Sequence, residues 1–175
     1  KILKKKKNLR LVDATYLKPS DNLKFNSLNE NILMQSEDKM IFKKKDFKIV
    51  SKKKPTKSQF DNLLFAFNIC RYVKSNAIVI ANNKTTIGIG SGQTSRLDSC
   101  KIAIEKMKKF SNVTSDIVAA SDAFFPFVDG IEKLVQSGVR AVIQPAGSIR
   151  DKEIIKFANQ TNTVLIFSKT RHFRH

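Results

Sequence analysis

From residue 117 to residue 167, three short apolar runs alternate with two segments that are expected to be helices. The apolar runs are Ile117–Ala120, Ala141–Gln144 and Val164–Phe167, and the helices are expected at about 130–136 and 149–159. Strands joined by a helix cross over in the right-handed sense and lie parallel in one sheet. The pattern therefore predicts an α/β fold with three layers, α/β/α, around a mostly parallel sheet.

A further helix and a β-hairpin are expected upstream. Thr56 and Gln59 have the spacing of a capping box, in which a hydroxyl and an amide satisfy free N–H groups at a helix start. Apolar residues follow at helical spacing. The run Ala77–Ala81 predicts a buried strand, and Thr85–Ile89 is its expected hairpin partner.

Residues 1–54 are rich in lysine and less regular. Three short strands are expected there, Leu9–Val12, Met40–Phe42 and Phe47–Val50, and residues 43–46 join the last two. These features are typical of an extended arm, so we expect an arm at residues 1–54 and one domain at residues 55–175.

The chain is strongly basic. It has 33 lysine and arginine residues against 15 acidic residues, a formal net charge of +18. Such a charge suits a polyanion-binding protein, but no pattern of an RNA-recognition motif, zinc finger or helix-turn-helix accompanies it. Charge runs are more often solvated surfaces. Nucleic acid is therefore not an expected partner, although the positive field would favour a modestly anionic small ligand.

Membrane and metal partners are not expected either. No apolar run approaches the roughly 20 residues of a membrane helix. Cys70 and Cys100 have neither the spacing of a metal site nor that of a disulfide framework, and no HxE or CxxC pattern is present. We expect both cysteines to be buried free thiols, and the protein to be cytoplasmic.

Four polar loops are expected at the carboxyl edge of the sheet, where ligands of open α/β sheets bind. The loop Gly90–Arg96 precedes a helix expected at about 94–110. A helix start with an arginine can bind an anion, and a tight turn with a solvent-facing arginine explains the motif equally well. The loop Pro145–Ser148 precedes another helix, where Ser148 can simply be its cap.

The two other loops contain aromatic rings. Residues 121–130 read Ser-Asp-Ala-Phe-Phe-Pro-Phe-Val-Asp-Gly, and their phenylalanines are either core residues or a wall for a flat heterocycle. Asp129 is either a helix cap or a ligand-binding acid. The tail Arg171–His175 contains both histidines. A frayed terminus is the usual interpretation of such a tail, but the strand expected at Val164–Phe167 would hold it at the same edge as the other loops.

These motifs, in this order, resemble the C-terminal part of AICAR transformylase, the formyl-transferring half of the bifunctional purine enzyme that also contains IMP cyclohydrolase. The resemblance rests on Lys74–Ile78, Gly88–Arg96, Ser121–Phe127, Gln144–Asp151 and Arg171–His175, with a looser match at Lys6–Arg10. It implies a cytidine-deaminase-like fold without the zinc. It also implies that 10-formyltetrahydrofolate donates a formyl group to the 5-amino group of AICAR, which gives FAICAR in purine biosynthesis.

The resemblance also implies roles for particular residues. Contacts to AICAR are implied for Asn76, Arg96, Phe124 and Arg171. Contacts to the folate co-substrate are implied for Leu97, Asp129, Gly130, Ser148 and Ile149. Two residues, Asn76 and His175, are implied to lie near the reacting groups as catalytic residues. With these roles, Phe124 and Asp129 are expected to face a ligand, whereas Phe125 and Phe127 can remain core residues.

One departure from the family pattern concerns the catalytic lysine-histidine pair, because no lysine of this chain is followed by histidine. We therefore expect the C-terminal half of a transformylase. A complementing N-terminal half or, since the family's site is shared across a dimer, a homodimer partner would complete it. A non-catalytic nucleotide- or folate-binding fragment is the alternative, and a basic polyanion-binding protein is a further one. Val128 also stands where many bacterial members have arginine.

Overall fold

The structure is a computed structural model that describes residues 5, 8–16, 23–113 and 115–175. Its contacts divide the chain into two units, Lys1–Glu37 and Asp38–His175. In the first unit, β1 (Lys24–Leu28) pairs antiparallel with β2 (Asn31–Gln35), and nearly all side chains of this hairpin are exposed. The sequence analysis did not predict this hairpin.

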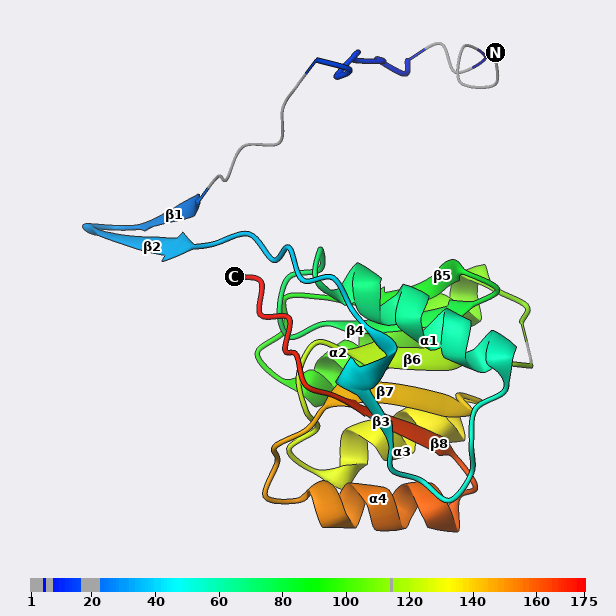
Figure 1. The fold of residues 1–175 in the computed structure, drawn as a ribbon. Coiled ribbons are helices and arrows are strands. Elements are labelled where there is room, and N and C mark those ends of the chain that lie inside the picture. The colour runs from blue at the N-terminus through cyan, green and yellow to red at the C-terminus, as the bar shows by residue number, and fades with distance from the viewer. Residues whose placement is uncertain (1–4, 6–7, 17–22, 114) are drawn as a thin grey trace. The chain divides into compact units, whose positions relative to one another are not determined.

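The second unit is built on a six-stranded sheet with the order β3-β8-β7-β6-β4-β5 (Figure 1). Its strands are β3 (Phe47–Ile49), β4 (Ile78–Asn82), β5 (Thr85–Gly90), β6 (Val118–Ser121), β7 (Ala141–Pro145) and β8 (Val164–Ser168). The pairs β6–β7 and β7–β8 are parallel, whereas β3–β8, β4–β5 and β4–β6 are antiparallel. The sheet is therefore mixed.

The expectation of a mostly parallel sheet is wrong, because three of the five strand pairs are antiparallel and two of these three involve β4 of the β4–β5 hairpin. Strand β4 pairs with β5 on one side and with β6 on the other, antiparallel to both. The strand-helix-strand pattern correctly predicts that β6, β7 and β8 lie parallel. It cannot show that β4 lies between β5 and β6.

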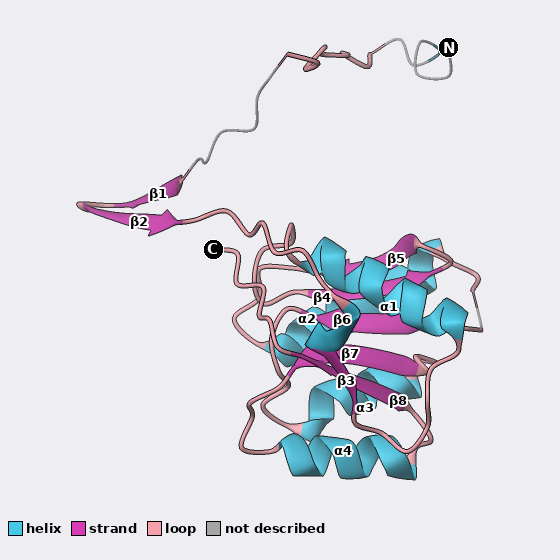
Figure 2. Ribbon diagram, in the orientation of Figure 1, coloured by secondary structure: helices cyan, strands magenta, loops and turns pink. Residues whose placement is uncertain are grey.

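Helices cover both faces of the sheet (Figure 2). The helix α1 (Lys57–Cys70) packs on one face, and α2 (Arg96–Phe110), α3 (Val128–Gln136) and α4 (Asp151–Gln160) pack on the other. The α/β class is thus confirmed, and the layers are those of an α/β/α arrangement. The more specific cytidine-deaminase-like assignment stays a prediction.

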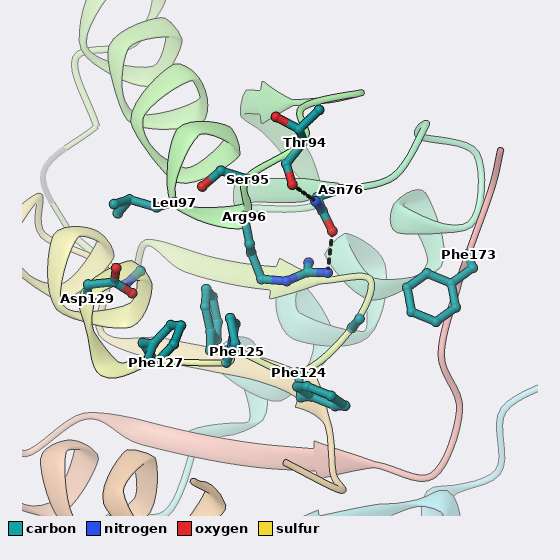
Figure 3. A pocket seen from close by; sticks show the side chains of 13 residues that line it. Asn76, Thr94, Ser95, Arg96, Leu97, Phe124, Phe125, Phe127, Asp129 and Phe173 are labelled. Carbon is teal, nitrogen blue, oxygen red and sulfur yellow. Dashed lines mark hydrogen bonds between the residues drawn. The ribbon is translucent and has the colours of Figure 1, made fainter. Parts of the chain in front are cut away.

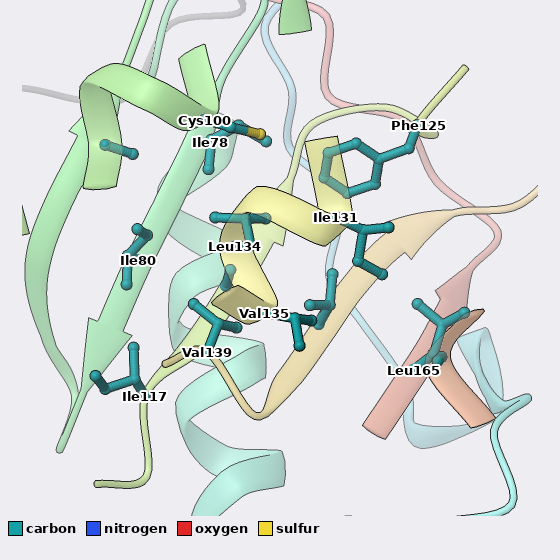
Figure 4. Packing of buried hydrophobic residues seen from close by; sticks show 14 of the residues in the cluster. Ile78, Ile80, Cys100, Ile117, Phe125, Ile131, Leu134, Val135, Val139 and Leu165 are labelled. Atoms are coloured by element: carbon teal, nitrogen blue, oxygen red, sulfur yellow. The ribbon is translucent and has the colours of Figure 1, made fainter. Parts of the chain in front are cut away.

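Two apolar clusters join the layers. Alternate residues of β4 serve opposite clusters, because successive strand side chains point to opposite faces: Val79 belongs to the cluster with α1, and Ile80 to the cluster with the other helices. Figure 4 shows the second cluster, in which Phe125 and Leu134 are completely or almost completely buried. Burial of each such side chain contributes roughly 1.5–3 kcal/mol to the stability of the fold. The loops at the sheet edge are therefore anchored to a well-packed core.

Two glycines let α2 approach β5 closely. A Cβ atom on Gly88 would lie 2.1 Å from the Ala103 carbonyl oxygen, and one on Gly90 would lie 1.9 Å from that of Ser99. No side chain fits at either position. This contact places the first turn of α2 directly beside the end of the sheet.

The segment before α1 differs from the expectation. Residues 9–12 and 40–42 form no strand, so two of the three predicted strands are wrong, whereas Phe47–Ile49 forms β3. A 3-10 helix, η2 (Lys44–Asp46), precedes β3, which pairs with β8. Phe42 packs 5.2 Å from Phe67, ring centroid to ring centroid, so aromatic burial and not strand pairing holds this segment. Lys6 and Lys7 of the looser motif match lie outside the described residues.

The predicted start of α1 is confirmed. The Thr56 hydroxyl accepts a hydrogen bond from the Gln59 backbone N–H, and the Gln59 side chain accepts one from the Thr56 N–H, both at 3.1 Å. The cysteines are also as expected, because both Cys70 and Cys100 are buried and free. Among the described residues, no helix is long and apolar enough to cross a membrane.

Candidate functional site

A cavity of about 430 Å³ opens where α2 and α3 begin (Figure 3). This volume lies within the range of roughly 300–1,000 Å³ that is usual for small-ligand sites. Its walls come from the segment before β4, the start of α2, the loop between β6 and α3, and the C-terminal tail. The lining residues are Asn76, Thr94–Leu97, Ala123–Phe127, Asp129, Gly130 and Phe173.

The carboxamide of Asn76 is held in one orientation. Its Nδ2 donates to the backbone carbonyl oxygens of Gln93 at 2.9 Å and Thr94 at 3.1 Å. Its Oδ1 accepts a hydrogen bond of 2.8 Å from Nη2 of Arg96. Because both Nδ2 protons are engaged, the group that Asn76 can still offer to a ligand is the second lone pair of Oδ1.

Arg96 is a buried cation of this wall, with 8% of its surface exposed. Its Nη1 is paired with a carboxylate oxygen of Asp122, which is completely buried, and also donates to Oγ of Ser121 at 2.8 Å. A buried guanidinium without a partner would be strongly destabilising. Asp122 therefore makes it possible for Arg96 to lie here, and the solvent-facing arginine that the sequence left open is wrong.

The three phenylalanines of the loop after β6 lie in different environments (Figure 3). Phe125 is 1% exposed and belongs to the core, as expected. Phe127 is 53% exposed and lines the cavity, so its prediction as a core residue is wrong. Phe127 is the N-cap of α3, and the buried face of this helix begins only at Gly130.

Two arginines lie over the phenylalanines of the cavity wall. The guanidinium carbon of Arg171 is 4.9 Å from the ring centroid of Phe124, and that of Arg150 is 4.9 Å from that of Phe127. Such cation–π contacts hold an arginine in place while leaving its N–H groups directed outward. Arg171 itself does not line the cavity but lies directly against its Phe124 wall.

The C-terminal tail is bonded to the segment before β4 and is not frayed. The His172 N–H donates to the Asp122 carbonyl oxygen at 2.8 Å, and the Ser75 N–H donates to that of Arg174 at 2.9 Å. Phe173 lines the cavity. The ring of His175 stacks on that of Phe173 with centroids 6.0 Å apart, so His175 lies behind Phe173 and is not a lining residue.

The side chain of His172 anchors this tail. It is 1% exposed, lies 4.5 Å from the Phe67 ring and 5.4 Å from the Phe42 ring, and its Nδ1 is bonded to the Asp38 carboxylate. Burial lowers the pKa of His172, and the hydrogen bond to Asp38 opposes this shift without cancelling it. Partial burial raises the pKa of Asp38, but the hydrogen bonds from His172 and the Met40 N–H outweigh it and lower the pKa.

The residues implied as folate contacts divide into two groups. Leu97, Asp129 and Gly130 line the cavity, where Oδ1 of Asp129 accepts a bond of 2.7 Å from the Gly130 N–H. Ser148, which is half-buried, and Ile149, which is exposed, lie in the loop before α4 and do not line the cavity. Ser148 is not the helix cap that the sequence favoured, because its Oγ accepts from the Arg150 N–H and Arg150 is the N-cap.

The structure thus brings together six of the ten residues singled out from the sequence. These six lining residues are Asn76, Arg96, Leu97, Phe124, Asp129 and Gly130. The sequence analysis missed Asp122, Phe173 and the pair Thr94 and Ser95. One signal in the sequence could have identified Asp122: it closely follows a predicted buried strand, at the sheet edge where the loop that contains Arg96 was also expected. Among the described residues, no group of three or more His, Cys, Asp and Glu side chains is placed to hold a metal ion.

Comparison with known proteins gives consistent relatives. Residues 1–106 match the family model described as the AICARFT/IMPCHase bienzyme. The chain is 46% identical over 177 positions to the bifunctional purine biosynthesis protein PurH of Buchnera aphidicola, 42% over 175 to that of Persephonella marina, and 44% over 174 to that of Chlorobium chlorochromatii.

These alignments cover 99–100% of this chain but 33–34% of the relatives, so the chain spans about a third of the length of the curated relatives that it matches. The family model covers more than half of the chain. The chain therefore belongs to the AICARFT/IMPCHase bienzyme family.

Proposed function

We propose that this chain forms the nucleotide and folate walls of an AICAR transformylase site, the C-terminal half of the formyl-transferring part of the bienzyme. There a formyl group passes from 10-formyltetrahydrofolate to the 5-amino group of AICAR. The observation that supports this most is the common cavity of Asn76, Arg96, Leu97, Phe124, Asp129 and Gly130. These residues come from three separate segments, namely the stretch before β4, the start of α2 and the stretch from the loop after β6 into α3, and the family resemblance assigns all six to ligand contact.

The nucleotide side is formed by Asn76, Phe124 and Arg171. The Phe124 ring offers a flat apolar surface to an imidazole ring. Arg171, whose guanidinium carbon lies 4.9 Å from the centre of that ring, is in this proposal the residue that binds the nucleotide phosphate. Arg96 has a different role from the one expected for a phosphate clamp, because its bonds go to Asp122, Ser121 and Asn76. It supports the nucleotide wall from behind.

The folate side is formed by Leu97, Asp129 and Gly130. The carboxylate of Asp129 can accept N–H groups of a pterin-type ring, and Leu97 supplies apolar contact. Ser148 and Ile149 lie outside the cavity, so in this proposal they contact the more distant part of a long co-substrate. Phe127 and the Arg150 above it lie on the same side.

Formyl transfer requires the 5-amino group of AICAR to be oriented toward the formyl carbon. The amine nitrogen of AICAR attacks the formyl carbon, a C–N bond forms, and the bond from that carbon to N10 of the folate breaks. The amine loses a proton and N10 gains one. Since both Nδ2 protons of Asn76 are engaged, Oδ1 accepts an amine N–H and directs the nitrogen lone pair at the formyl carbon.

The proton acceptor of this reaction is expected from elsewhere. In the family a lysine-histidine pair serves, and no such dipeptide occurs in this sequence. His172 is bonded to Asp38 in the core, and His175 stacks behind Phe173. We therefore propose that an N-terminal half, or a second subunit, completes the site.

A second candidate function is ligand binding without turnover. It is favoured by one observation: the described residues that line the cavity include no histidine, lysine or cysteine, and Asp129 is the one carboxylate among them. A binding module of this kind would hold AICAR and a folate and release both unchanged.

Two measurements separate these candidates. Calorimetric titrations of the chain with AICAR and with a folate should both show binding, and Asn76→Ala and Arg171→Ala should weaken AICAR binding by about tenfold or more. Absence of binding by the unmodified chain would refute both candidates.

Turnover is then tested in a mixture. The chain is combined with a PurH relative from which the matching third has been deleted, and FAICAR formation is followed. Formyl transfer that is lost with Asn76→Ala supports the transformylase, and binding without transfer supports the binding module. Full transfer activity with both Asn76→Ala and Arg171→Ala would refute the assigned nucleotide wall.

A further inference from the structure

Asp122 lies at the centre of the hydrogen bonds behind the cavity wall, although it does not line the cavity itself. It is completely buried directly after β6. One carboxylate oxygen is paired with Nη1 of Arg96, and the other accepts a hydrogen bond of 2.5 Å from the Ser75 hydroxyl. The guanidinium and the hydroxyl donor together satisfy both carboxylate oxygens of this buried side chain.

The backbone of Asp122 makes two more connections. Its N–H donates to the Ala77 carbonyl oxygen at 3.2 Å, and its carbonyl oxygen accepts from the His172 N–H at 2.8 Å. One residue therefore joins the segment before β4, the first turn of α2 and the C-terminal tail. These are three of the four segments that form the cavity walls.

The effect of Asp122 reaches the cavity through Arg96. The guanidinium is planar, so fixing Nη1 against Asp122 also fixes the direction of Nη2. Nη2 donates to Oδ1 of Asn76 at 2.8 Å, and this bond determines which end of the carboxamide is the acceptor. With Nη2 in place, the Nδ2 end of Asn76 faces the carbonyl oxygens of Gln93 and Thr94.

We propose that Asp122 is a positioning residue for the nucleotide amine: through Arg96 it keeps Oδ1 of Asn76 turned toward the ligand. This inference rests on the proposed function, because it concerns the same nucleotide wall. Without the charge of Asp122, Nη1 of Arg96 keeps only its bond to Ser121, so the guanidinium loses its fixed position and the bond from Nη2 to Oδ1 of Asn76 weakens. Oδ1 is then no longer held in the direction that the amine of the ligand needs.

The test compares Asp122→Asn in two backgrounds. Asparagine keeps the size of the side chain and removes its charge. In the otherwise unmodified chain we expect Asp122→Asn to weaken AICAR binding about tenfold or more, because a hydrogen bond that involves a charged group is disturbed. In the Asn76→Ala background, the same change should weaken it less than about twofold.

Two controls separate positioning from a general loss of structure. Folate binding should change less than about twofold in Asp122→Asn. Asp98→Asn, a change on α2 at a half-buried side chain that is paired with Lys101, should alter the affinity for neither ligand. Equal losses of AICAR affinity in both backgrounds, or equal losses of AICAR and folate affinity, would overturn the proposal.

A spectroscopic measurement covers the case in which Asp122→Asn does not fold, and it needs no ligand. In the unmodified chain, the Nη protons of Arg96 and the Nδ2 protons of Asn76 should give separate NMR signals that exchange slowly with water, unlike those of the exposed Arg150. Fast, averaged signals from Arg96 would overturn the positioning role. If the unmodified chain shows slow signals but does not bind AICAR, the proposed function fails while the hydrogen-bond arrangement stands.

Discussion

His172 provides a sharp test of how the C-terminal tail is held beside the cavity. Replacement by alanine removes two ring contacts, to Phe67 at 4.5 Å and to Phe42 at 5.4 Å, and the bond to the Asp38 carboxylate. Aromatic contacts contribute about 0.5–1.5 kcal/mol each, and a hydrogen bond to a partly solvated carboxylate contributes about 1.5 kcal/mol. The free energy of unfolding should therefore fall by about 3–4 kcal/mol.

Replacement of His172 by phenylalanine separates the ring from the hydrogen bond. Phenylalanine keeps the aromatic contacts and loses the bond to Asp38, so we expect a loss of about 1.5 kcal/mol. Urea unfolding followed by far-UV circular dichroism measures all three proteins. The matched control is His175→Ala, an exposed change that should alter stability little.

The same variants test the pKa of His172. Its pKa is lowered in the folded protein, so the folded state binds fewer protons than the unfolded state below about pH 6.5. Stability must then fall as the pH decreases, by at most about 1.4 kcal/mol per pH unit. The His172→Phe variant should lose this slope between about pH 8 and pH 5. An unchanged slope, or a native protein that becomes more stable with acid, would refute the reasoning.

Three further predictions concern the fold. Thr56→Ala removes the hydroxyl of the capping box and should lower the free energy of unfolding by about 1 kcal/mol, measured by urea unfolding; no change would contradict the cap. Gly90→Ala places a Cβ atom 1.9 Å from the Ser99 carbonyl oxygen and should cost about 3 kcal/mol or more, visible as loss of folded protein, whereas a stable variant would contradict the contact between α2 and β5. Burial raises the pKa of Cys100 to about 12 and that of Cys70 well above its usual value, so a thiol reagent near neutral pH should label both only after unfolding; rapid labelling of the native protein would contradict their burial.

The sequence predicted the part of the fold that local patterns determine. The capping box at Thr56, the apolar runs of β6 to β8 and the helices between them follow from periodicity and turn residues. The position of β4 between β5 and β6, and the pairing of β3 with β8, depend on contacts between distant segments. No local pattern specifies them. Phe42 shows the same limit. In the sequence it stands in a short apolar run that is typical of a strand, but in the structure it is held by its contact with the distant Phe67.

The site was predictable to a similar extent. Loop motifs identified the residues that contact the cavity, such as Asn76 and Phe124. They did not identify what those residues bond to in the absence of a ligand. The resemblance implies that Arg96 contacts the nucleotide, whereas in the structure its guanidinium pairs with the buried Asp122. Such a partner is visible only when the strand end at Asp122 and the start of α2 are placed together in three dimensions.

The central claim is that the cavity beside α2 and α3 binds the nucleotide amine substrate. The most direct test is an NMR titration of the isotopically labelled chain with AICAR. We predict chemical-shift changes confined to the amides of residue 76, residues 94–97, 123–130 and 171–173. Unchanged spectra, or shifts centred on the lysine-lined surface of α4 at Lys152 and Lys156, would contradict it.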